Sequence, residues 1–566
     1  MGIKRVRVIT NVCEALVIWQ LDKPIAGCRG FALEREVKGE RKTEFLKTWV
    51  GFKGQKHAPG ESRPSTEWPI QRFSWSDYED HPGKQLRYRV IPMIGSANDL
   101  KKGPENQWSK WTDWTTIATG QTKGFEAYFN QGIVPSQWIS RQDPTKQSLE
   151  KDISDPNSPN RKFLSGELRL ALLRLLADAK KDGVKIYAAL FELNDPELTE
   201  AVKALGSKCS LLLGNGAYKP ADKKKGIAAE LDENQTARDY LRKNSDVKIY
   251  DRIVKSPHFA HNKFVVFCDK QGNPASVWTG STNWTMTGLC TQVNNGILIR
   301  DAKLAAAYLH RWEDLKDSES GYPPFLAEDG TIPGSDTPGG AEVTAWNTPL
   351  LKFADLEDAN THIKAAKQGV LFLMFNPGPK NTLLNTILGL DPNKLFIHGV
   401  VNQDPGGKKA PLIKIMHKGQ PLPARKLDVI VPAGLQQASN WFDDTFTFSR
   451  VMIHSKIVVV DPFGDEPVVM TGSHNFGPKA SAKNDDNFVI ITKAPGLAAE
   501  YAINIMNVYG HYKWMYNQSL MKAPGLKTVK KTNWQYDGNY DNDTWQDGYL
   551  VGNGLKETNF WFGKCS

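Results

Sequence analysis

The sequence predicts an α/β protein made of two similar α/β sandwich lobes related by a pseudo-twofold axis and preceded by an all-β sandwich domain. Three observations lead to this prediction. Residues 1–118 alternate apolar and polar side chains between turn signals, which is typical of strands. From about residue 120, helical spacings alternate with short apolar strands, as in an α/β sheet. The pattern of this second region then occurs twice.

The first 118 residues form the predicted β-sandwich, with strands expected at 15–19, 30–35, 70–75 and 85–91. The segment RFSWSDYEDHPGKQLRYRVIPM, together with Trp19, resembles a fibronectin type III domain. Such modules position or bind partners, so the resemblance implies a possible protein partner for this domain. Trp108, Trp111 and Trp114 follow at a spacing of three, and we interpret them as packing residues rather than a stacking surface.

The remaining chain divides into a first lobe (119–318), a linker (319–342), a second lobe (343–525) and an extension (526–566). The linker is rich in Gly, Pro, Ser and Asp. The Asn- and Trp-rich extension is expected to pack over the second lobe. In the first lobe we expect helices at 164–181, 196–206, 227–243 and 301–315, and strands at 184–191, 209–213, 247–250 and 296–299. In the second lobe we expect helices at 356–367, 381–388 and 497–515, and strands at 370–375, 395–401, 413–416, 427–431 and 488–491.

Composition sets broad limits on the 566-residue chain. Its 40% hydrophobic content suits globular domains, and its net charge of +10 favours a polyanionic partner such as nucleic acid or anionic lipid. No apolar run reaches the ~18 residues of a membrane span, and no signal peptide is visible. We therefore expect a cytoplasmic protein without a transmembrane segment, with the mature form of a secreted chain as the alternative.

One polar pattern occurs in both lobes. The first copy consists of His261, Lys263, Asp269, Ser281 and Asn283. The second copy, 193 residues later, consists of His454, Lys456, Asp461, Ser473 and Asn475. In each copy the His and Lys enter an apolar β-branched run that ends at the acid, and Gly-Ser-x-Asn follows a turn.

The pattern suits chemistry at phosphorus. Residues i and i+2 of a strand share a face, so each His lies beside its Lys, and a twofold axis would bring both pairs together. Two ammonium groups and the Ser and Asn side chains would then bind the phosphate oxygens. One imidazole attacks phosphorus and the other protonates the leaving alcohol. Water or an alcohol would then resolve the phosphohistidine, and neither a metal nor a cofactor is expected.

Both copies resemble the phospholipase D superfamily, whose signature is His-x-Lys-x4-Asp with a downstream Gly-Ser/Gly-x-Asn. The second copy matches this spacing, whereas the first has Cys268 at the acid position and Asp269 one residue later. Asp269 and Asp461 each precede the Gly of the pattern by 11 residues. We therefore expect one inserted residue between Lys263 and Asp269, as a β-bulge, with the acid retained. The resemblance covers about residues 121–520 and implies catalytic roles for the His, Lys and Asp of each copy.

The family also places a residue that orients the His in a following strand. The second half offers Asp486 for this role, and the first half offers Asn294. A carboxylate partner favours the imidazolium form. The hypothesis is therefore that His454, paired with Asp486, is the general acid and that His261 is the nucleophile. Among the other histidines, His474 is the best candidate for a further role because it lies inside the second copy.

Several functions fit these observations. The first is a metal-independent phosphodiesterase of the phospholipase D type, which cleaves a phospholipid headgroup ester or a nucleic-acid backbone and can transfer the product to an alcohol. The second is a nuclease proper. The third is a catalytically impaired scaffold that binds phosphate while its β-sandwich recruits a partner. Mild basicity favours nucleic acid, whereas two motifs in one chain and the lack of a base-reading module favour phospholipid.

Overall fold

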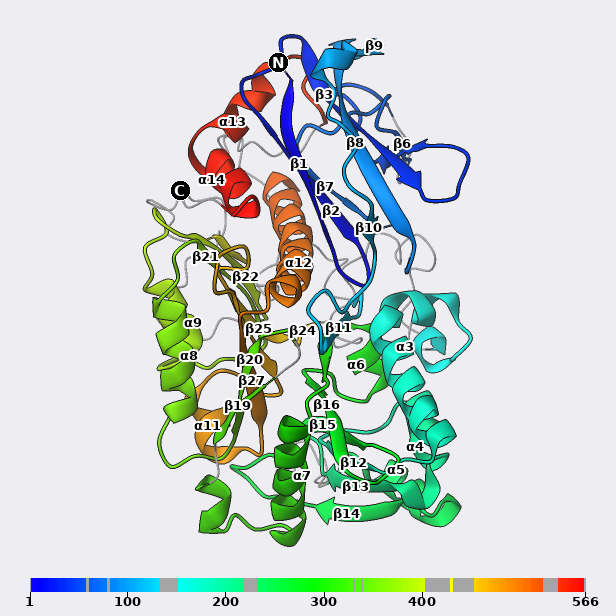
Figure 1. Ribbon diagram of the computed structural model, residues 1–566, viewed down its shortest axis with the longest axis vertical. Coiled ribbons are helices and arrows are strands. Elements are labelled where there is room, and N and C mark those ends of the chain that lie inside the picture. The colour runs from blue at the N-terminus through cyan, green and yellow to red at the C-terminus, as the bar shows by residue number, and fades with distance from the viewer. Residues whose placement is uncertain are drawn as a thin grey trace.

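The structure is a computed structural model. It describes residues 2–56, 61–78, 82–132, 151–217, 232–328, 331–336, 339–402, 428–430, 452–522 and 538–563. The expected strand at 413–416 and the first part of the expected helix at 227–243 lie outside these residues. The described chain is a mixed α/β structure with a β-rich N-terminal region, as the sequence predicts (Figure 1).

Two small sheets form the N-terminal region. The first has the order β1 (Ile3–Thr10), β2 (Ala15–Leu21) and β7 (Ser74–Asp77). The second has the order β10 (Thr115–Thr116), β8 (Gln85–Ser96), β3 (Cys28–Val37) and β4 (Glu44–Phe45), with β9 (Asp99–Lys102) on β8. A further ladder joins β5 (Lys47–Thr48) to β6 (Arg63–Pro64). Apolar side chains on facing strands, including Trp19, Phe31 and Tyr88, form a shared core.

The three tryptophans that follow β9 pack against arginines of β8. The Arg87 guanidinium lies 4.9 Å from the ring centre of Trp111 and 4.7 Å from that of Trp114. Arg89 lies 4.8 Å from Trp108 and 4.7 Å from Trp111. The rings and guanidinium groups thus alternate, and the contacts support the interpretation of these residues as packing residues.

The first lobe contains a seven-stranded sheet. Its order is β11 (Phe125–Phe129), β18 (Asn295–Ile299), β16 (Pro274–Gly280), β15 (Lys263–Cys268), β12 (Ile186–Leu190), β13 (Cys209–Gly214) and β14 (Lys248–Arg252). The helices are α3 (Pro159–Asp182), α4 (Pro196–Lys203), α5 (Gln235–Asn244), α6 (Met286–Cys290) and α7 (Ala302–Asp317). Helix α3 begins where the Ser158 side chain accepts from two backbone N–H groups, and it ends at Gly183, whose φ is +66°.

The second lobe repeats this plan with eight strands. Their order is β19 (Thr331–Asp336), β20 (Glu342–Asn347), β27 (Asn487–Thr492), β26 (Val468–Gly472), β25 (Lys456–Val460), β21 (Gly369–Met374), β22 (Phe396–Val401) and β23 (Asp428–Ile430). From β20 to β23 the order matches that of the first lobe from β11 to β14. The helices are α8 (Ala354–Lys364), α9 (Leu383–Leu388), α11 (Pro478–Lys483) and α12 (Pro495–Lys522).

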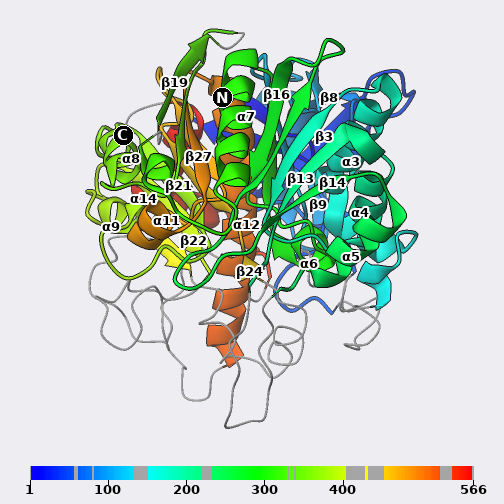
Figure 2. The same ribbon diagram turned by 90° about the horizontal axis from the view of Figure 1, so that it is seen from below.

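Part of the expected linker belongs to the second sheet. Strand β19 pairs antiparallel with β20, so residues 331–336 form an edge strand rather than a free connection. Figure 2 shows the two sheets side by side with α7 at their junction, and α7 contacts both β16 and β19. Helix α12 runs between the N-terminal region and the lobes, where it contacts β1, β11 and β22 (Figure 1).

The C-terminal extension packs against the N-terminal region as well as against the second lobe, where it was expected. Trp545 inserts into the core of the N-terminal region, and its Nε1–H donates to the Cys28 carbonyl at 3.0 Å. The following helices α13 (Asp547–Leu550) and α14 (Gly552–Trp561) lead back to the second lobe, where Phe560 contacts Phe396 with ring centres 4.4 Å apart. The extension therefore joins the N-terminal region to the second lobe, because its aromatic side chains fill both cores.

Candidate active site

The His and Lys of both sequence copies meet where the two lobes join. Lys263 opens β15 and Lys456 opens β25, and each His lies two residues earlier on the same face. All four side chains are buried: His261 is 7% exposed, His454 is 4%, Lys263 is 1% and Lys456 is 0%. Each Lys Nζ donates to the carbonyl of its own His, at 2.7 Å in the first lobe and 2.6 Å in the second.

Each histidine is oriented by a residue of the opposite lobe. His261 Nδ1 lies 2.7 Å from Asp486 Oδ1, and His454 Nδ1 lies 2.9 Å from Asn294 Oδ1. The expected pairing of His454 with Asp486 is therefore wrong, although both orienting residues are used. Asp486 and Asn294 immediately precede the strands β27 and β18, at the interface between the lobes, so their side chains cross to the other lobe.

These partners fix which ring nitrogen carries hydrogen. A carboxylate only accepts, so His261 Nδ1–H donates to Asp486. The Asn294 amide donates from Nδ2 to the Gly288 carbonyl at 2.8 Å, and its Oδ1 accepts from Ser281 at 2.7 Å. His454 Nδ1–H therefore donates to that same oxygen. In both rings Nε2 is left to carry either the reactive lone pair or the exchangeable proton.

The two serines hydrogen-bond to the orienting residues. Ser473 Oγ–H donates to Asp486 Oδ1 at 2.6 Å, and Ser281 Oγ–H donates to Asn294. Their oxygens also accept from the backbone N–H groups of Asn487 and Asn295. Both hydroxyl groups are thus engaged within the protein, and a role for Ser281 and Ser473 in binding phosphate stays a prediction.

The glycine before each serine explains why the pattern needs this residue type. Gly280 and Gly472 have φ values of +146° and +148°. A Cβ atom on either residue would lie 2.4 Å from the carbonyl oxygen of Asn295 or Asn487 on the neighbouring strand. The close approach of these strand ends brings the serine to the orienting residue.

The two acids of the pattern lie far from the histidines. Asp461 follows the last residue of β25 and accepts backbone N–H groups of Lys367, Gln368 and Gly369 at 2.7, 2.7 and 2.9 Å. It lies five positions after Lys456, which amounts to roughly 16 Å along a strand. Asp269 accepts from the backbone of Gln271 and Asn273 in a surface turn. The expected catalytic roles of Asp269 and Asp461 are therefore corrected to local structural roles.

The extra residue of the first copy also lies elsewhere. Strand β15 pairs with β12 without a break, and Cys268 N–H donates to the Lys185 carbonyl as Asp461 N–H does to the Gly369 carbonyl. Cys268 therefore takes the place of Asp461. The register shifts only on the other side, between Phe267 and Cys268 against β16. The extra residue is therefore Ala275 of β16, which is skipped between Ser276 and Pro274, and Cys268 rather than an acid occupies the position of Asp461.

The asparagines of the two copies differ in their surroundings. Asn283 Nδ2–H donates to Glu192 Oε2 at 2.7 Å. The Oδ1 atoms of Asn283 and Asn475 are buried without a hydrogen-bond partner among the described residues. A role for Asn283 and Asn475 in binding phosphate stays a prediction.

Several residues of the site are missing from the sequence prediction. Phe191 and Phe375 cover the histidines with ring centres 4.8 Å apart in each case. Lys263 Nζ lies 4.7 Å from the Phe191 ring centre, and Lys456 Nζ lies 4.8 Å from that of Phe375. A sequence signal was available, because each Phe follows an equivalent buried strand, β12 or β21. Glu192, which accepts from Asn283, comes directly after Phe191.

His474 has a structural role. Its Nδ1 accepts from the Phe476 backbone N–H at 2.9 Å, so the hydrogen is on Nε2. This Nε2 lies 3.3 Å from Asp355 Oδ2, and both side chains are fully buried. The imidazole thus holds α8 and the turn after β26 together behind the site.

The site brings two histidines and two lysines together away from water, and this lowers the pKa of each. Burial lowers the pKa of His261 to about 4, although Asp486 opposes the shift. Burial also lowers the pKa of Lys263 to about 7. The pKa values of His454 and Lys456 fall well below their usual values, through burial and then through the neighbouring lysines. Burial would raise the Asp486 pKa, but His261 holds it below its usual value. An anion bound between Lys263 and Lys456 would relieve the repulsion between their positive charges.

The match to a family model shows which protein family the chain belongs to. A family model described as "Cardiolipin synthase, PLD-like domain" matches residues 170–315 and 360–507, which together make up more than half of the chain. The chain belongs to this PLD-like domain family. Each matched segment carries one His, its Lys and one orienting residue, so the PLD-like domain comprises both halves of the site. A search of curated proteins found no match.

Three of the solved structures that match part of this chain are described below. Phosphatidylserine synthase of Haemophilus influenzae Rd KW20 has 15% identity over 61% of this chain and 85% of its own, with a TM-score of 0.41. The phospholipase D family member Nuc of Salmonella typhimurium has 17% identity over 30% of this chain and 95% of its own, with a TM-score of 0.20. Yeast tyrosyl-DNA phosphodiesterase has 12% identity over 55% of this chain and 83% of its own, with a TM-score of 0.27.

Two features are absent from the residues that the structure describes. No helix among them has the length and apolar character needed to cross a membrane. No group of three or more His, Cys, Asp or Glu side chains within the same residues is arranged to hold a metal ion.

Proposed function

We propose that the protein is a phospholipase D-type phosphodiesterase that works through a covalent phosphohistidine on His261. The observation that carries this proposal is the meeting of two His–Lys pairs from two lobes, with each imidazole held through Nδ1 by the opposite lobe. Nucleophilic catalysis needs an oriented, neutral imidazole, and the lowered pKa of His261 keeps it neutral at pH 7. Membership of the PLD-like domain family supports chemistry on phosphodiesters.

The different partners of the histidines assign the two roles. When Nε2 of His261 bonds to phosphorus while Nδ1 keeps its hydrogen, the ring becomes cationic, and the adjacent Asp486 carboxylate stabilises that charge. His454 faces the neutral Asn294 amide, which does not hold an imidazolium as tightly, so His454 is the better proton donor. The assignment agrees with the hypothesis from the sequence but rests on the opposite pairing.

The lysines supply the binding energy for the phosphate. Both ammonium groups lie in a dry environment, where their attraction to the non-bridging oxygens is stronger than in water. A bound diester also raises the pKa values of Lys263, Lys456 and His454, because its negative charge favours their protonated forms. The substrate thereby helps to charge the general acid.

The reaction then proceeds in two balanced steps. His261 attacks phosphorus, the phosphorus–oxygen bond to the alcohol breaks, and His454 gives its proton to the leaving oxygen. His454, now neutral, takes a proton from water, the hydroxide attacks phosphorus, and the bond to His261 breaks. An alcohol in place of water gives transfer of the phosphoryl group instead of hydrolysis.

We favour a phospholipid as the diester, because the matching family model carries the name of cardiolipin synthase. A nucleic-acid backbone is the second candidate, favoured by the net charge of +10. We also propose that the lobes are related by a pseudo-twofold axis, supported by their common strand order, and that the N-terminal region is a fibronectin type III-like module.

A substrate panel tests this proposal. Wild type and His454→Ala are incubated, with a chelator present, with phospholipid vesicles, single-stranded DNA and double-stranded DNA, and products are measured. We expect wild type alone to release headgroup from the vesicles. Release from DNA alone would establish the nuclease instead. If wild type cuts none of these substrates, the phosphodiesterase proposal fails and a phosphate-binding scaffold is favoured.

A further inference from the structure

The residue before Asp486 carries a second carboxylate that binds the opposite lobe. Arg252, the last residue of β14, donates from Nε to Asp485 Oδ2 at 2.9 Å and from Nη2 to Oδ1 at 3.2 Å. Its Nη1 donates to the backbone carbonyls of Glu319 and, at 2.8 Å, Gly321. The Arg252 and Asp485 side chains are 1% and 2% exposed. All three nitrogens of the guanidinium are engaged, so its plane is fixed.

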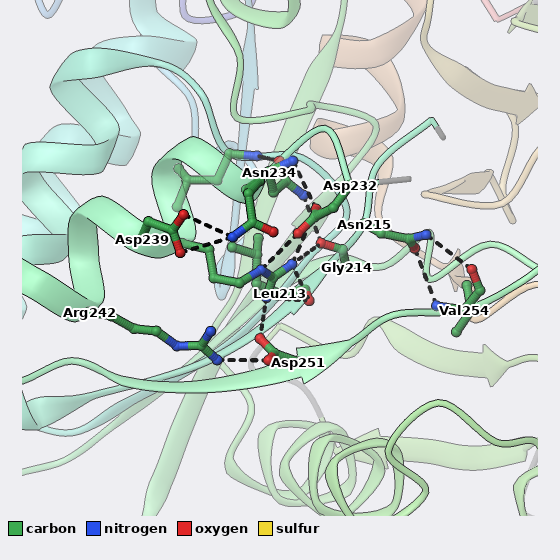
Figure 3. Close-up of polar contacts among 12 residues, drawn as sticks. Leu213, Gly214, Asn215, Asp232, Asn234, Asp239, Arg242, Asp251 and Val254 are labelled. Atoms are coloured by element: carbon green, nitrogen blue, oxygen red, sulfur yellow. Dashed lines mark hydrogen bonds and ion pairs between the residues drawn. The ribbon is translucent and has the colours of Figure 1, made fainter. Parts of the chain in front are cut away.

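Asp485 holds both ends of the segment that leads to His261. Its side chain binds Arg252, and its backbone N–H donates to the Phe259 carbonyl at 2.9 Å, two residues before His261. Between these points Val254 exchanges hydrogen bonds with the Asn215 amide at 3.0 and 3.4 Å (Figure 3). The segment from β14 to His261 is therefore fixed at its start and near its end by a single residue of the second lobe.

The His454 side of the site is built differently. There β17 (Gln292–Val293) pairs in parallel with β24 (Met452–Ile453), and His454 N–H donates to the Val293 carbonyl at 3.0 Å. A strand ladder thus places Asn294 against His454. No described strand covers the residues just before His261. The ion pair occurs at the place where this second ladder is missing.

We propose that Arg252 and Asp485 are positioning residues that set the distance and direction of the His261–Asp486 hydrogen bond. Adjacent side chains of an extended segment point to opposite sides, so Asp485 can bind Arg252 while Asp486 faces His261. The ion pair then fixes the backbone of both acids relative to the first lobe. The part of this proposal that concerns catalysis rests on the proposed function of His261.

A buried ion pair is weak evidence of a gain in stability, because desolvation of both charges offsets their attraction. Replacement by an apolar pair of similar volume is often neutral or stabilising. An apolar pair would nevertheless lack the directional hydrogen bonds that the planar Arg252 guanidinium makes. This difference separates a positioning role from a merely structural one.

The experiment compares Asp485→Asn, Arg252→Lys and the double variant Arg252→Met/Asp485→Leu with wild type. Arg238 provides a matched control, since it is also a buried arginine, bonded to Asp232, Asp251 and the Gly214 carbonyl but not to the second lobe. The measurements are kcat and KM on the diester that wild type cleaves, the midpoint of thermal unfolding, and the NMR signal of the His261 Nδ1–H after ¹⁵N labelling of histidine.

Both single variants are expected to lose about 10- to 100-fold in kcat, with KM changed less than about 3-fold. Their Nδ1–H signal should move upfield as the bond to Asp486 lengthens, while Lys263 and Lys456 still face the ring. The double variant should recover the unfolding midpoint but not kcat. Arg238→Met should lower the midpoint and leave kcat and the Nδ1–H signal unchanged.

Two results would overturn the positioning role. One is recovery of kcat together with stability in the double variant, and the other is an unchanged Nδ1–H signal in Asp485→Asn and Arg252→Lys. If wild type cleaves no diester, the proposed function fails, whereas the NMR comparison still tests the geometry. If Asp485→Asn does not fold, the milder Arg252→Lys variant still provides kcat and the Nδ1–H signal for the test.

Discussion

Asp486 shows how one side chain sets the chemistry of another across a domain boundary. It accepts from His261 Nδ1, Ser473 Oγ and, through Oδ2, Asn484 Nδ2 at 3.1 Å. These donors keep the carboxylate ionised inside the protein, where burial alone would favour its neutral form. The negative charge is thus present to stabilise the cationic phosphohistidine that we propose on His261.

Replacement of Asp486 by Asn should therefore impair catalysis more than folding. We expect kcat to fall by about 100-fold or more, because an amide neither stabilises the cationic ring nor enforces the tautomer. Asp461→Asn is the matched control, since Asp461 also accepts several N–H groups but lies at the far end of its strand. Steady-state kinetics of both variants decide the matter, and an equal loss of kcat in Asp461→Asn would refute the assignment.

Anion binding should be accompanied by proton uptake. Lys263 has a pKa of about 7 in the free site, so at pH 8 much of it is neutral, and a bound anion raises this pKa and draws in a proton. Titration calorimetry with inorganic phosphate in buffers of different ionisation enthalpy measures the number of protons taken up. We expect uptake at pH 8 and less uptake for Lys263→Met. Proton release at pH 8 would contradict the lowered pKa of Lys263 in the free site.

At the scale of elements, helix α12 carries a buried acid where it meets the N-terminal region. Burial raises the pKa of Glu500 to about 8, although its carboxyl group accepts from Thr119 Oγ1 at 2.8 Å and from the Gln121 backbone N–H at 3.0 Å. The folded pKa lies above the unfolded value of 4.5, so the protonated form is the one that the fold prefers.

This acid predicts how stability changes with pH. Its stabilising contribution is complete below pH 4.5 and is lost as the pH rises towards 8, at about 1.4 kcal/mol per pH unit between the two values. Glu500→Gln is neutral at every pH and should remove this slope. Denaturant unfolding at pH 5 and pH 9 measures it. The variant should gain stability relative to wild type at the higher pH, and a parallel change in both proteins would be inconsistent with a buried, protonated Glu500.

Strand pairing also explains where the sequence prediction succeeded and failed. The apolar runs before and after each pattern predicted β15, β21 and β25 because buried strands require them. The count of 11 residues between acid and Gly was compatible with an extra residue on either strand of the hairpin. Only the register shows that β15 is regular and that Cys268 occupies the acid position. Sequence spacing alone does not contain this information.

At the scale of the molecule, the C-terminal extension stabilises the N-terminal region. Trp545 packs edge-on against Phe31 and Phe73, with ring centres 5.8 and 6.1 Å away, and Gln546 Oε1 accepts the Ile25 backbone N–H at 3.0 Å. The expectation of an extension over the second lobe was incomplete because composition does not say which core an aromatic side chain enters.

Trp545→Ala should destabilise the protein by about 3–5 kcal/mol, because a large buried ring is removed from a packed core. The active site is elsewhere, so kcat should remain within about twofold of wild type under native conditions. Trp49, which is 50% exposed, provides the control, and Trp49→Ala should change stability by less than about 1 kcal/mol. Denaturant unfolding compares the two, and an equal effect would show that Trp545 is not a core residue in solution.

The two-lobed site was largely predictable, but its cross-connections were not. His261, Lys263, His454 and Lys456 stand out because chemistry at phosphorus requires these residue types at this spacing. The exchange of orienting residues between lobes depends on how the two sheets face each other, and that is a property of the assembled molecule. The place of Phe191 and Phe375 beside the histidines was not predicted, because a Phe after a buried strand is ordinary in any α/β sequence.

The most direct test of the central claim is to trap and map the phosphohistidine. Wild type, His261→Ala and His454→Ala are mixed with ³²P-labelled bis(p-nitrophenyl) phosphate, whose leaving group needs no proton, and quenched in alkali before peptide mapping. Label is expected on the peptide that contains His261, in greater amount in His454→Ala, where hydrolysis of the intermediate is slowed. No label is expected in His261→Ala. Label on His454, or equal labelling of His261→Ala, would contradict the account.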